Sequence, residues 1–278
     1  MNHFPRKIMR LSSEPAATAQ PNSHPAPNTV VPLHDGEVMM VCAPIAYAAT
    51  WPVTWLDLRE RQRLTAYRFA ADRRRHHAAH ALKRWVIGQL VNQPPQRLAF
   101  TVDGRGKPRL VEPALHFNLS HSGGWVAMAL RQNAEVGIDV EQARLPAASL
   151  SWPTIRHPDE SELPDTASFL KTWTLKEAVS KCCGEGLMLE FTRLRLRPDT
   201  QTDFRCDDGQ RHWHAWHGML DVDTHLAIAS TSAWSRLRWL QVACDYSLSQ
   251  RSATRLAGQC AELLAKSIAE MADVAVAQ

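Results

Sequence analysis

The chain has 278 residues, of which 45% are hydrophobic and 22% are charged, and its formal net charge at pH 7 is +4. These values are ordinary for folded proteins and exclude a disordered or fibrous chain. The longest apolar stretch, Val38–Trp51, is interrupted by Pro44 and is shorter than the roughly 20 residues of a membrane-spanning helix. The N-terminal residues show no apolar secretory segment, so we expect a cytoplasmic protein without a membrane partner.

Positive charge is concentrated in one segment, Arg59–Arg84, which contains nine basic and two acidic residues and therefore carries a net charge of +7. The remainder of the chain sums to −3. A local field of this strength attracts an anion or an acidic surface.

In chain order, residues 1–33 are rich in Pro, Ala and Ser and lack periodicity, which predicts a flexible tail. Hydrophobic periodicity predicts a strand at Glu37–Cys42 and helices over Leu56–Leu90, with a break near Ala70–Asp72. The further predicted strands are Leu98–Val102, His116–Leu119, Trp125–Leu130, Val136–Glu141, Thr192–Arg197, Trp213–Met219 and Leu226–Thr231. The further predicted helices are Phe169–Cys183, closed by Gly184, and Ser249–Ala272.

This order predicts the α+β class with two similar α+β lobes in one chain. We expect an N-terminal lobe at 34–133 that carries the basic helices, and a C-terminal lobe at 134–244 that carries an acidic site. A C-terminal helix over 245–278 follows.

The segment Gly137–Glu141 alternates like a half-buried strand. Ile138 and Val140 then face the core, and Asp139 and Glu141 lie together on the opposite face. Two adjacent carboxylates repel each other unless a cation or solvent relieves the repulsion. Taken alone, the segment is equally compatible with a solvated strand face and with a cation site.

A second acidic residue pattern lies in Trp173–Lys181, where helical spacing puts Trp173, Glu177 and Lys181 on one face. An ordinary Glu–Lys pair on a helix is the simpler interpretation of this segment alone. If Glu177 meets Asp139 and Glu141 in space, three carboxylates without His or Cys suit a hard cation such as Mg²⁺.

Between two predicted strands lies the turn Ser120-His121-Ser122-Gly123. Two hydroxyls, free backbone N–H groups and an imidazole at one turn could bind an anion. A plain hairpin, in which glycine supplies the turn conformation, is the alternative.

These three motifs, in this order, resemble those of the Sfp-type 4′-phosphopantetheinyl transferases. The family pattern has a Ser-His-Ser-Gly turn, a Gly-Ile-Asp-(Ile/Val)-Glu strand and a Trp-(Ser/Thr)-x-Lys-Glu-(Ser/Ala)-x-x-Lys helix. This chain has all three, and it also has Gly106-Lys107-Pro108 and Gly184-Glu185-Gly186-Leu187. The resemblance covers about residues 60–231.

The resemblance implies an enzyme that moves the 4′-phosphopantetheine arm of coenzyme A onto a serine hydroxyl of an apo acyl or peptidyl carrier protein. Such carriers serve fatty acid, polyketide or nonribosomal peptide biosynthesis, and the reaction releases 3′,5′-ADP. The resemblance also implies a monomer with internal pseudo-twofold symmetry and an active site between the lobes.

Residue by residue, the resemblance implies that Asp139, Glu141 and Glu177 hold Mg²⁺ against the coenzyme A pyrophosphate, with Lys181 near the reacting phosphate. It implies that Ser120 and His121 contact the 3′-phosphate region of the nucleotide, that Lys107 lies beside the nucleotide, and that Arg75 binds a phosphate. Family members often carry two lysines earlier on the basic helix. Gln62 and Thr65 stand at those positions here, so the outer phosphate contacts depart from the pattern.

The attacking hydroxyl belongs to the carrier protein, so this chain must supply only a group that takes its proton. Glu177 is the first candidate for this general base and Glu141 the second, and the sequence does not separate them or Mg²⁺ from Mn²⁺. Two other hypotheses stay open. One is a basic module that binds nucleic acid, which leaves the three carboxylates unexplained. The other is a homologue that binds coenzyme A without turnover, against which the intact acidic triplet speaks.

Overall fold

The structure is a computed structural model that describes residues 32–111, 115–143, 151–161, 165–242 and 248–251. The predicted tail at 1–33 lies outside these residues except for its last two positions. In the described part of the chain, no helix combines the length and the apolar character that crossing a membrane requires.

Two five-stranded sheets form the centre of the molecule. The first has the order β12-β11-β1-β5-β4 and the second the order β6-β10-β9-β8-β7. The first sheet consists of β1 (Glu37–Pro44), β4 (Leu115–Ser122), β5 (Trp125–Gln132), β11 (Arg236–Val242) and β12 (Leu248–Arg251). The second consists of β6 (Val136–Gln142), β7 (Arg195–Pro198), β8 (Asp203–Asp207), β9 (His212–Met219) and β10 (Thr224–Ser230). Neighbouring strands are antiparallel except for the parallel pair of β1 and β11.

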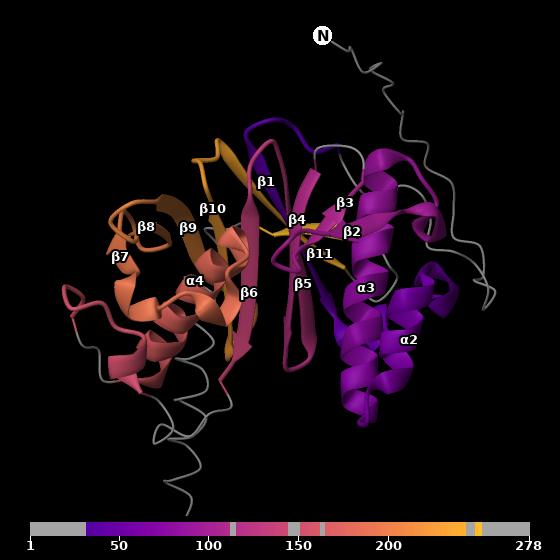
Figure 1. The fold of residues 1–278 in the computed structure, drawn as a ribbon, viewed down its shortest axis with the longest axis horizontal. Coiled ribbons are helices and arrows are strands. Elements are labelled where there is room, and N and C mark those ends of the chain that lie inside the picture. Colours follow the sequence, from indigo (N-terminus) through magenta and orange to yellow (C-terminus); the bar gives the residue numbers. More distant parts are fainter. Residues whose placement is uncertain (1–31, 112–114, 144–150, 162–164, 243–247, 252–278) are drawn as a thin grey trace, which may run out of the picture.

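The helices are α1 (Ile45–Ala48), α2 (Leu58–Ala66), α3 (Ala70–Val91) and α4 (Thr166–Cys183), and a hairpin of β2 (Phe100–Val102) and β3 (Pro108–Leu110) precedes β4. Short 3₁₀ turns occupy residues 53–55, 95–97, 152–154, 186–188 and 191–193. Figure 1 shows α2 and α3 on one side of the molecule and α4 on the other, with β4, β5 and β6 between them.

Local sequence explains where the helices begin and end. A capping box between Asp57 and Glu60 opens α2, and the Asp165 carboxylate accepts from the Ser168 N–H at the start of α4. The helix α4 ends at Gly184, whose φ of 73° lies in the left-handed region that glycine tolerates. The predicted break within 56–90 is confirmed, because the extended residues Tyr67 and Phe69 separate α2 from α3.

Alternation along the strands gives each sheet two buried faces. Met39 and Val41 of β1 pack in the cluster that contains the apolar face of α3, whereas Val38 and Met40 pack against the second sheet. Ile138 and Val140 of β6 belong to this cluster between the sheets. The opposite face of the second sheet is covered by α4. The layers are therefore helix, sheet, sheet and helix, and the α+β class is confirmed.

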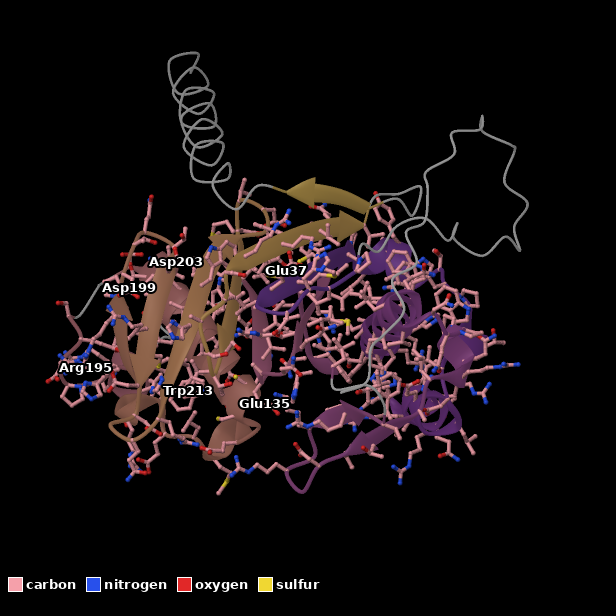
Figure 2. The ribbon with its side chains drawn as sticks, turned by 90° about the horizontal axis from the view of Figure 1, so that it is seen from above. Glu37, Glu135, Arg195, Asp199, Asp203 and Trp213 are labelled. Carbon is pink, nitrogen blue, oxygen red and sulfur yellow. The ribbon has the colours of Figure 1, made fainter. Side chains whose placement is uncertain are left out.

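Strands β11 and β12 follow the second sheet in the chain but complete the first one. Val38 of β1 is paired with Leu237 of β11, and the buried Glu37 carboxylate accepts from Arg238 across this pair. Figure 2 shows Arg195, Asp199 and Asp203 at the far end of the second sheet from Glu37. The predicted lobe boundaries and the pseudo-twofold relation between the lobes stay predictions.

One element was predicted wrongly at its start. The C-terminal helix predicted over 245–278, and from Ser249 in particular, does not begin there, because Leu248–Arg251 form β12 and extend the sheet beside β11. Backbone pairing with a strand that is already in place overrides local helix propensity at these positions. The remainder of that predicted helix lies outside the described residues.

Candidate active site

A cavity of about 340 Å³ lies between the start of α3 and the turn that joins β4 to β5. It is lined by residues from both elements, namely Tyr67, Asp72, Arg75, His76, His121, Ser122 and Gly123. The basic helix and the Ser-His-Ser turn, which were predicted separately to bind an anion, therefore meet at one cavity.

Arg75 and His121 are the two groups of the cavity that were predicted to bind phosphate. The Arg75 guanidinium donates to Asp72 Oδ1 at 2.7 Å, and Asp72 is its only hydrogen-bond partner among the described residues. Because a guanidinium has five N–H donors, most of them remain available to a phosphate. Burial of the ring lowers the pKa of His121, and the charges of Lys181 and Arg75 lower it further, although the residue as a whole is exposed.

Side chains alternate between the two faces of β4, so the histidine and the hydroxyl or amide side chains of this strand point in opposite directions. His121 faces the side of α3, whereas Asn118, Ser120 and Ser122 face β6. The Asn118 Oδ1, Ser120 Oγ and Ser122 Oγ atoms accept from the backbone N–H groups of Ile138, Val140 and Gln142 at 3.1, 3.3 and 3.1 Å. These side chains satisfy the free edge of β6 and join the two sheets. We call this line of three contacts the β4–β6 seam.

The seam also orients the two carboxylates of β6. Ser120 Oγ donates to Asp139 Oδ1 at 2.9 Å, and Ser122 Oγ donates to Glu141 Oε2 at 3.1 Å. The Trp173 indole N–H of α4 donates to Glu141 Oε1 at 3.4 Å. Asp139 is 2% exposed, so the interpretation of this segment as a solvated strand face is wrong. Asp139 and Glu141 instead face α4.

From α4, Lys181 and Glu177 complete the acidic site. The Lys181 ammonium donates to Asp139 Oδ1 at 2.5 Å and to Ser120 Oγ at 2.9 Å. Burial raises the pKa of Glu177, and the charges of Asp139 and Glu141 raise it further against the opposing effect of Lys181. The charges of Asp139 and Glu141 thus act on Glu177, which indicates that the three carboxylates lie in one region of the molecule. Their predicted joint binding of a cation stays a prediction.

Burial also raises the pKa of Glu141, and the charge of Asp139 adds to this effect, whereas hydrogen bonds from Ser122 and Trp173 oppose it. Asp139 Oδ2 is buried and has no hydrogen-bond partner in the described structure. An unpartnered carboxylate oxygen beside two carboxylates that resist ionisation is a costly arrangement that a cation would relieve.

The donor set fits a hard divalent cation in its chemistry, since every candidate ligand atom is a carboxylate oxygen. In the residues that the structure describes, however, no three His, Cys, Asp or Glu side chains are already arranged to hold a metal ion. The Lys181 ammonium supplies the positive charge next to Asp139 in this arrangement.

Comparisons with known proteins agree with this geometry. Residues 135–229 match the family model described as the 4′-phosphopantetheinyl transferase superfamily, and residues 43–133 match the model of the 4′-phosphopantetheinyl transferase N-terminal region. The 4′-phosphopantetheinyl transferase psf-1 of Bacillus pumilus is 33% identical over 164 residues, which are 55% of this chain and 70% of that protein. This chain belongs to the 4′-phosphopantetheinyl transferases.

Two other relatives come from different kinds of organism. The 4′-phosphopantetheinyl transferase HetI of a Nostoc species is 34% identical over 153 residues, which are 50% of this chain and 64% of that protein. An L-aminoadipate-semialdehyde dehydrogenase-phosphopantetheinyl transferase of Xenopus laevis is 27% identical over 201 residues, which are 61% of this chain and 66% of that protein. The matched part of the chain thus spans about two thirds of these relatives.

Two residues that were predicted to contact the nucleotide have all their hydrogen-bonding capacity used inside the transferase. Ser120 is buried, donates to Asp139, and accepts from both Lys181 and the Val140 N–H. The Lys107 side chain is 5% exposed, and its ammonium donates to three protein acceptors. In this arrangement neither side chain has a donor left for coenzyme A.

Sequence reasoning missed two contributors to the site. Trp173 was placed on the same helix face as Glu177 and Lys181 but was given no role, and its indole N–H donates to Glu141. Tyr67, which precedes α3, was not singled out and lines the cavity. One signal was present in the sequence: Asn118, Ser120 and Ser122 stand 20 residues before Ile138, Val140 and Gln142, at the alternate positions of two strands.

Proposed function

We propose that this protein transfers the 4′-phosphopantetheine arm of coenzyme A to a serine hydroxyl of an apo carrier protein and releases 3′,5′-ADP, with Mg²⁺ held by Asp139, Glu141 and Glu177. One observation carries this proposal. A buried, unpartnered oxygen of Asp139 lies beside two carboxylates of raised pKa, and the nearby cavity contains Arg75 and His121.

The cavity supports binding of the nucleotide phosphates. Coenzyme A carries a diphosphate and a 3′-phosphate, and the planar guanidinium of Arg75 suits such oxygens. A neutral His121 can donate one ring N–H to a phosphate, and a bound phosphate would favour its protonated form. Lys181 bridges the cavity and the acidic site, since its charge acts on His121 and its ammonium contacts Asp139.

The acidic site supports binding of the cation. When bound, Mg²⁺ would neutralise charge on the diphosphate and on the departing 3′,5′-ADP. Ser120 and Ser122 would keep the Asp139 and Glu141 carboxylates in place, because each serine is itself fixed by a backbone N–H of β6. Lys181 would donate to the phosphoryl oxygens as negative charge develops on them.

The structure supports Glu177 over Glu141 as the general base. Both carboxylates have a raised pKa, which strengthens them as bases near neutral pH. Glu141 accepts hydrogen bonds from Ser122 and Trp173, whereas Glu177 has no hydrogen-bond partner in the described residues. We infer that Glu177, directly or through a water, takes the proton of the carrier serine as its oxygen bonds to phosphorus and the diphosphate P–O bond breaks.

Intact-protein mass spectrometry tests the proposal. The protein is incubated with coenzyme A, MgCl₂ and a panel of apo carrier proteins, and each carrier should gain the mass of one phosphopantetheine arm. Asp139→Ala and Glu177→Ala should abolish this gain with an unchanged circular dichroism spectrum. Glu190→Ala, at an exposed acidic position outside the site, is the matched control and should retain transfer. Transfer by either site variant at the wild-type rate would refute the metal assignment.

Thermal unfolding without carrier protein gives a second measurement for the cation. Millimolar MgCl₂ should raise the Tm of the wild type, because a ligand of the folded state stabilises it. The same addition should leave the Tm of Asp139→Ala unchanged. An equal rise in both proteins would show that Mg²⁺ binds elsewhere.

A nucleic-acid-binding module remains the alternative that the charge of Arg59–Arg84 suggests. Lys83 and Arg84 are buried in ion pairs with Glu60, so they are unavailable to phosphates. Salt-sensitive binding of DNA without transfer to any carrier would favour this alternative.

Four further properties stay predictions: the monomeric state, the cytoplasmic location, the pseudo-twofold relation of the lobes and the preference for Mg²⁺ over Mn²⁺.

A further inference from the structure

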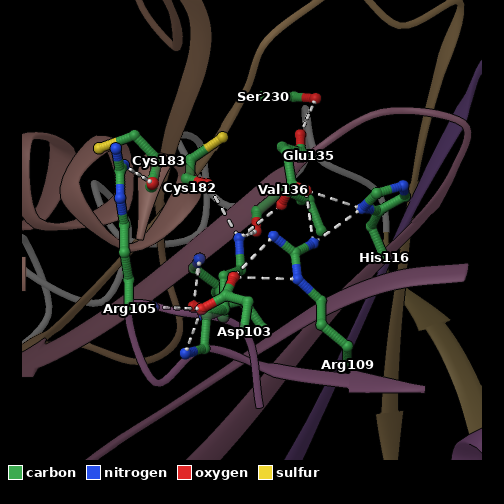
Figure 3. Close-up of polar contacts among 12 residues, drawn as sticks. Asp103, Arg105, Arg109, His116, Glu135, Val136, Cys182, Cys183 and Ser230 are labelled. Carbon is green, nitrogen blue, oxygen red and sulfur yellow. Dashed lines mark hydrogen bonds and ion pairs between the residues drawn. The ribbon is translucent and has the colours of Figure 1, made fainter. Parts of the chain in front are cut away.

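The C-terminal end of α4 is capped by side chains from a distant hairpin. A helix leaves its last carbonyls without an intrahelical partner. In α4, the Gly184 N–H satisfies Ser180 O, whereas Cys182 O accepts from the Lys107 ammonium at 2.9 Å. Cys183 O accepts from the Arg105 guanidinium at 2.9 Å. Both cations lie in the segment between β2 and β3, and positive charge at this end is favoured by the helix dipole. Figure 3 shows this cluster.

The Lys107 ammonium joins three parts of the chain at once. It donates to Glu135 Oε2 at 2.8 Å, to Val136 O at 3.1 Å and to Cys182 O at 2.9 Å. These bonds use all three of its protons. They explain the burial of this charge, because a buried ammonium is stable only when it is paired and hydrogen-bonded.

The acceptor at the centre of this cluster is itself fixed. Burial opposes ionisation of Glu135, but hydrogen bonds from His116, Lys107 and Arg109 outweigh it and hold the pKa of this carboxyl well below its ordinary value. Arg109 also donates to Asp103 Oδ2, and Asp103 Oδ1 accepts from the Lys107 N–H at 2.9 Å. The lysine is therefore held at both its backbone and its ammonium.

Lys107 connects α4 to β6, and these two elements carry Lys181 and Asp139 of the proposed active site. Cys182 directly follows Lys181 on α4, and Val136 opens β6 three residues before Asp139. Lys181 and Asp139 are in contact at 2.5 Å. A shift of the end of α4 relative to the start of β6 would lengthen this contact and move Glu177 with it.

We propose that Lys107, assisted by Arg105, is a positioning residue that fixes α4 against β6 and thereby sets the geometry of Lys181 and Glu177. This inference rests on the proposed function and replaces the predicted nucleotide contact of Lys107. The Lys107 ammonium would then serve the reaction through the end of a helix, since its three protons are bonded to protein acceptors.

The steady-state kinetics of Lys107→Met separate the two roles. Removal of the ammonium should lower kcat about 10- to 100-fold, since small displacements of reacting groups are costly. The Kd of coenzyme A, measured by calorimetry, should change less than about twofold, because no contact to the nucleotide is lost. Lys83→Met is the matched control. It removes another buried ammonium that is paired with a glutamate, and it should lower stability but retain kcat at temperatures below its Tm.

Hydrogen–deuterium exchange tests the tie independently of turnover. Peptides that cover residues 177–186 should exchange faster in Lys107→Met and at the wild-type rate in Lys83→Met. If Lys107→Met does not fold, Arg105→Met replaces it. Its accessible guanidinium bonds the same helix end, so we expect faster exchange there and a kcat loss of about 2- to 5-fold.

A Kd increase of tenfold or more with retained kcat would overturn the positioning role and restore the nucleotide contact. Unchanged exchange and unchanged kcat in the variant would also overturn it. These results differ from failure of the proposed function, in which the wild-type protein itself transfers nothing to any carrier.

Discussion

The close contact between α4 and β6 depends on Gly137, and replacing it by alanine gives the sharpest test of the site. A Cβ atom built at Gly137 would lie 2.1 Å from Ala178 O and 2.4 Å from Cys182 N. Real Cβ atoms essentially never approach other atoms within 3.0 Å, and both obstacles are helix backbone that cannot rotate away. The helix must therefore move by about 1 Å, at a cost typical of overpacked cores, about 1–3 kcal/mol.

We expect Gly137→Ala to lose roughly 4–8 °C in Tm, which corresponds to about 2 kcal/mol for a chain of this size. Because the shift carries Glu177 and Lys181 away from Asp139, we also expect kcat to fall about 100-fold. Thermal unfolding by circular dichroism and the carrier mass assay measure the two effects.

Gly104→Ala is the matched control for this substitution. A Cβ at Gly104 meets nothing within 4 Å, so this variant should unfold and react like the wild type. If Gly137→Ala matched the wild type in both Tm and kcat, the contact between helix and strand would not set the geometry of the site.

The remaining predictions concern three charged residues. Arg75→Ala should raise the Kd of coenzyme A about tenfold or more, because a charge-assisted hydrogen bond is lost, and it should leave kcat within about threefold. Arg74→Ala, at an exposed neighbouring position, is the control. A change in kcat alone would contradict the assignment of Arg75 to coenzyme A binding. Burial opposes ionisation of Glu60, but His80, Lys83 and Arg84 lower its pKa far below 4.5, so its stabilising effect is present above pH 4.5 and is lost as the pH falls below it. Glu60→Gln should therefore cost about 3–5 kcal/mol in urea unfolding at pH 7, and equal midpoints at pH 7 would rule this out. Burial and the charge of Asp139 raise the pKa of Glu177 above 4.5, so its ionisation destabilises the folded state at neutral pH. Glu177→Gln should abolish transfer yet raise the Tm of the metal-free protein at pH 7, with a difference that shrinks toward pH 4.5; a lower Tm at pH 7 would be the opposite of this expectation.

Features that depend on local pattern were predictable from the sequence. The alternation in β6 assigned Ile138 and Val140 to the core and Asp139 and Glu141 to the other face, as observed. Helical spacing assigned Glu177 and Lys181 to one face of α4. Side-chain direction in these elements follows from their periods of 2 and 3.6 residues.

Features that depend on distant partners were not predictable. Nothing in Arg236–Val242 indicates that this segment pairs with β1 across about 200 residues, because strand pairing is a property of two segments. The acceptors of Lys107 were hidden from the sequence for the same reason. Its motif is local, but its three protons are donated to distant acceptors. These are Glu135, which directly precedes β6, Val136 of β6 and Cys182 of α4.

The parallel pairing of β1 with β11 also bears on how the chain reaches its fold. During synthesis β1 emerges almost 200 residues before β11. One edge of β1, the central strand of the first sheet, therefore stays unpaired until most of the chain has been made. Folding of the first half therefore ends in a partly built sheet with an open edge, and high contact order slows its completion. A fragment that stops at Gln132 would keep that edge exposed, where strands of other molecules can add to it and aggregation begins.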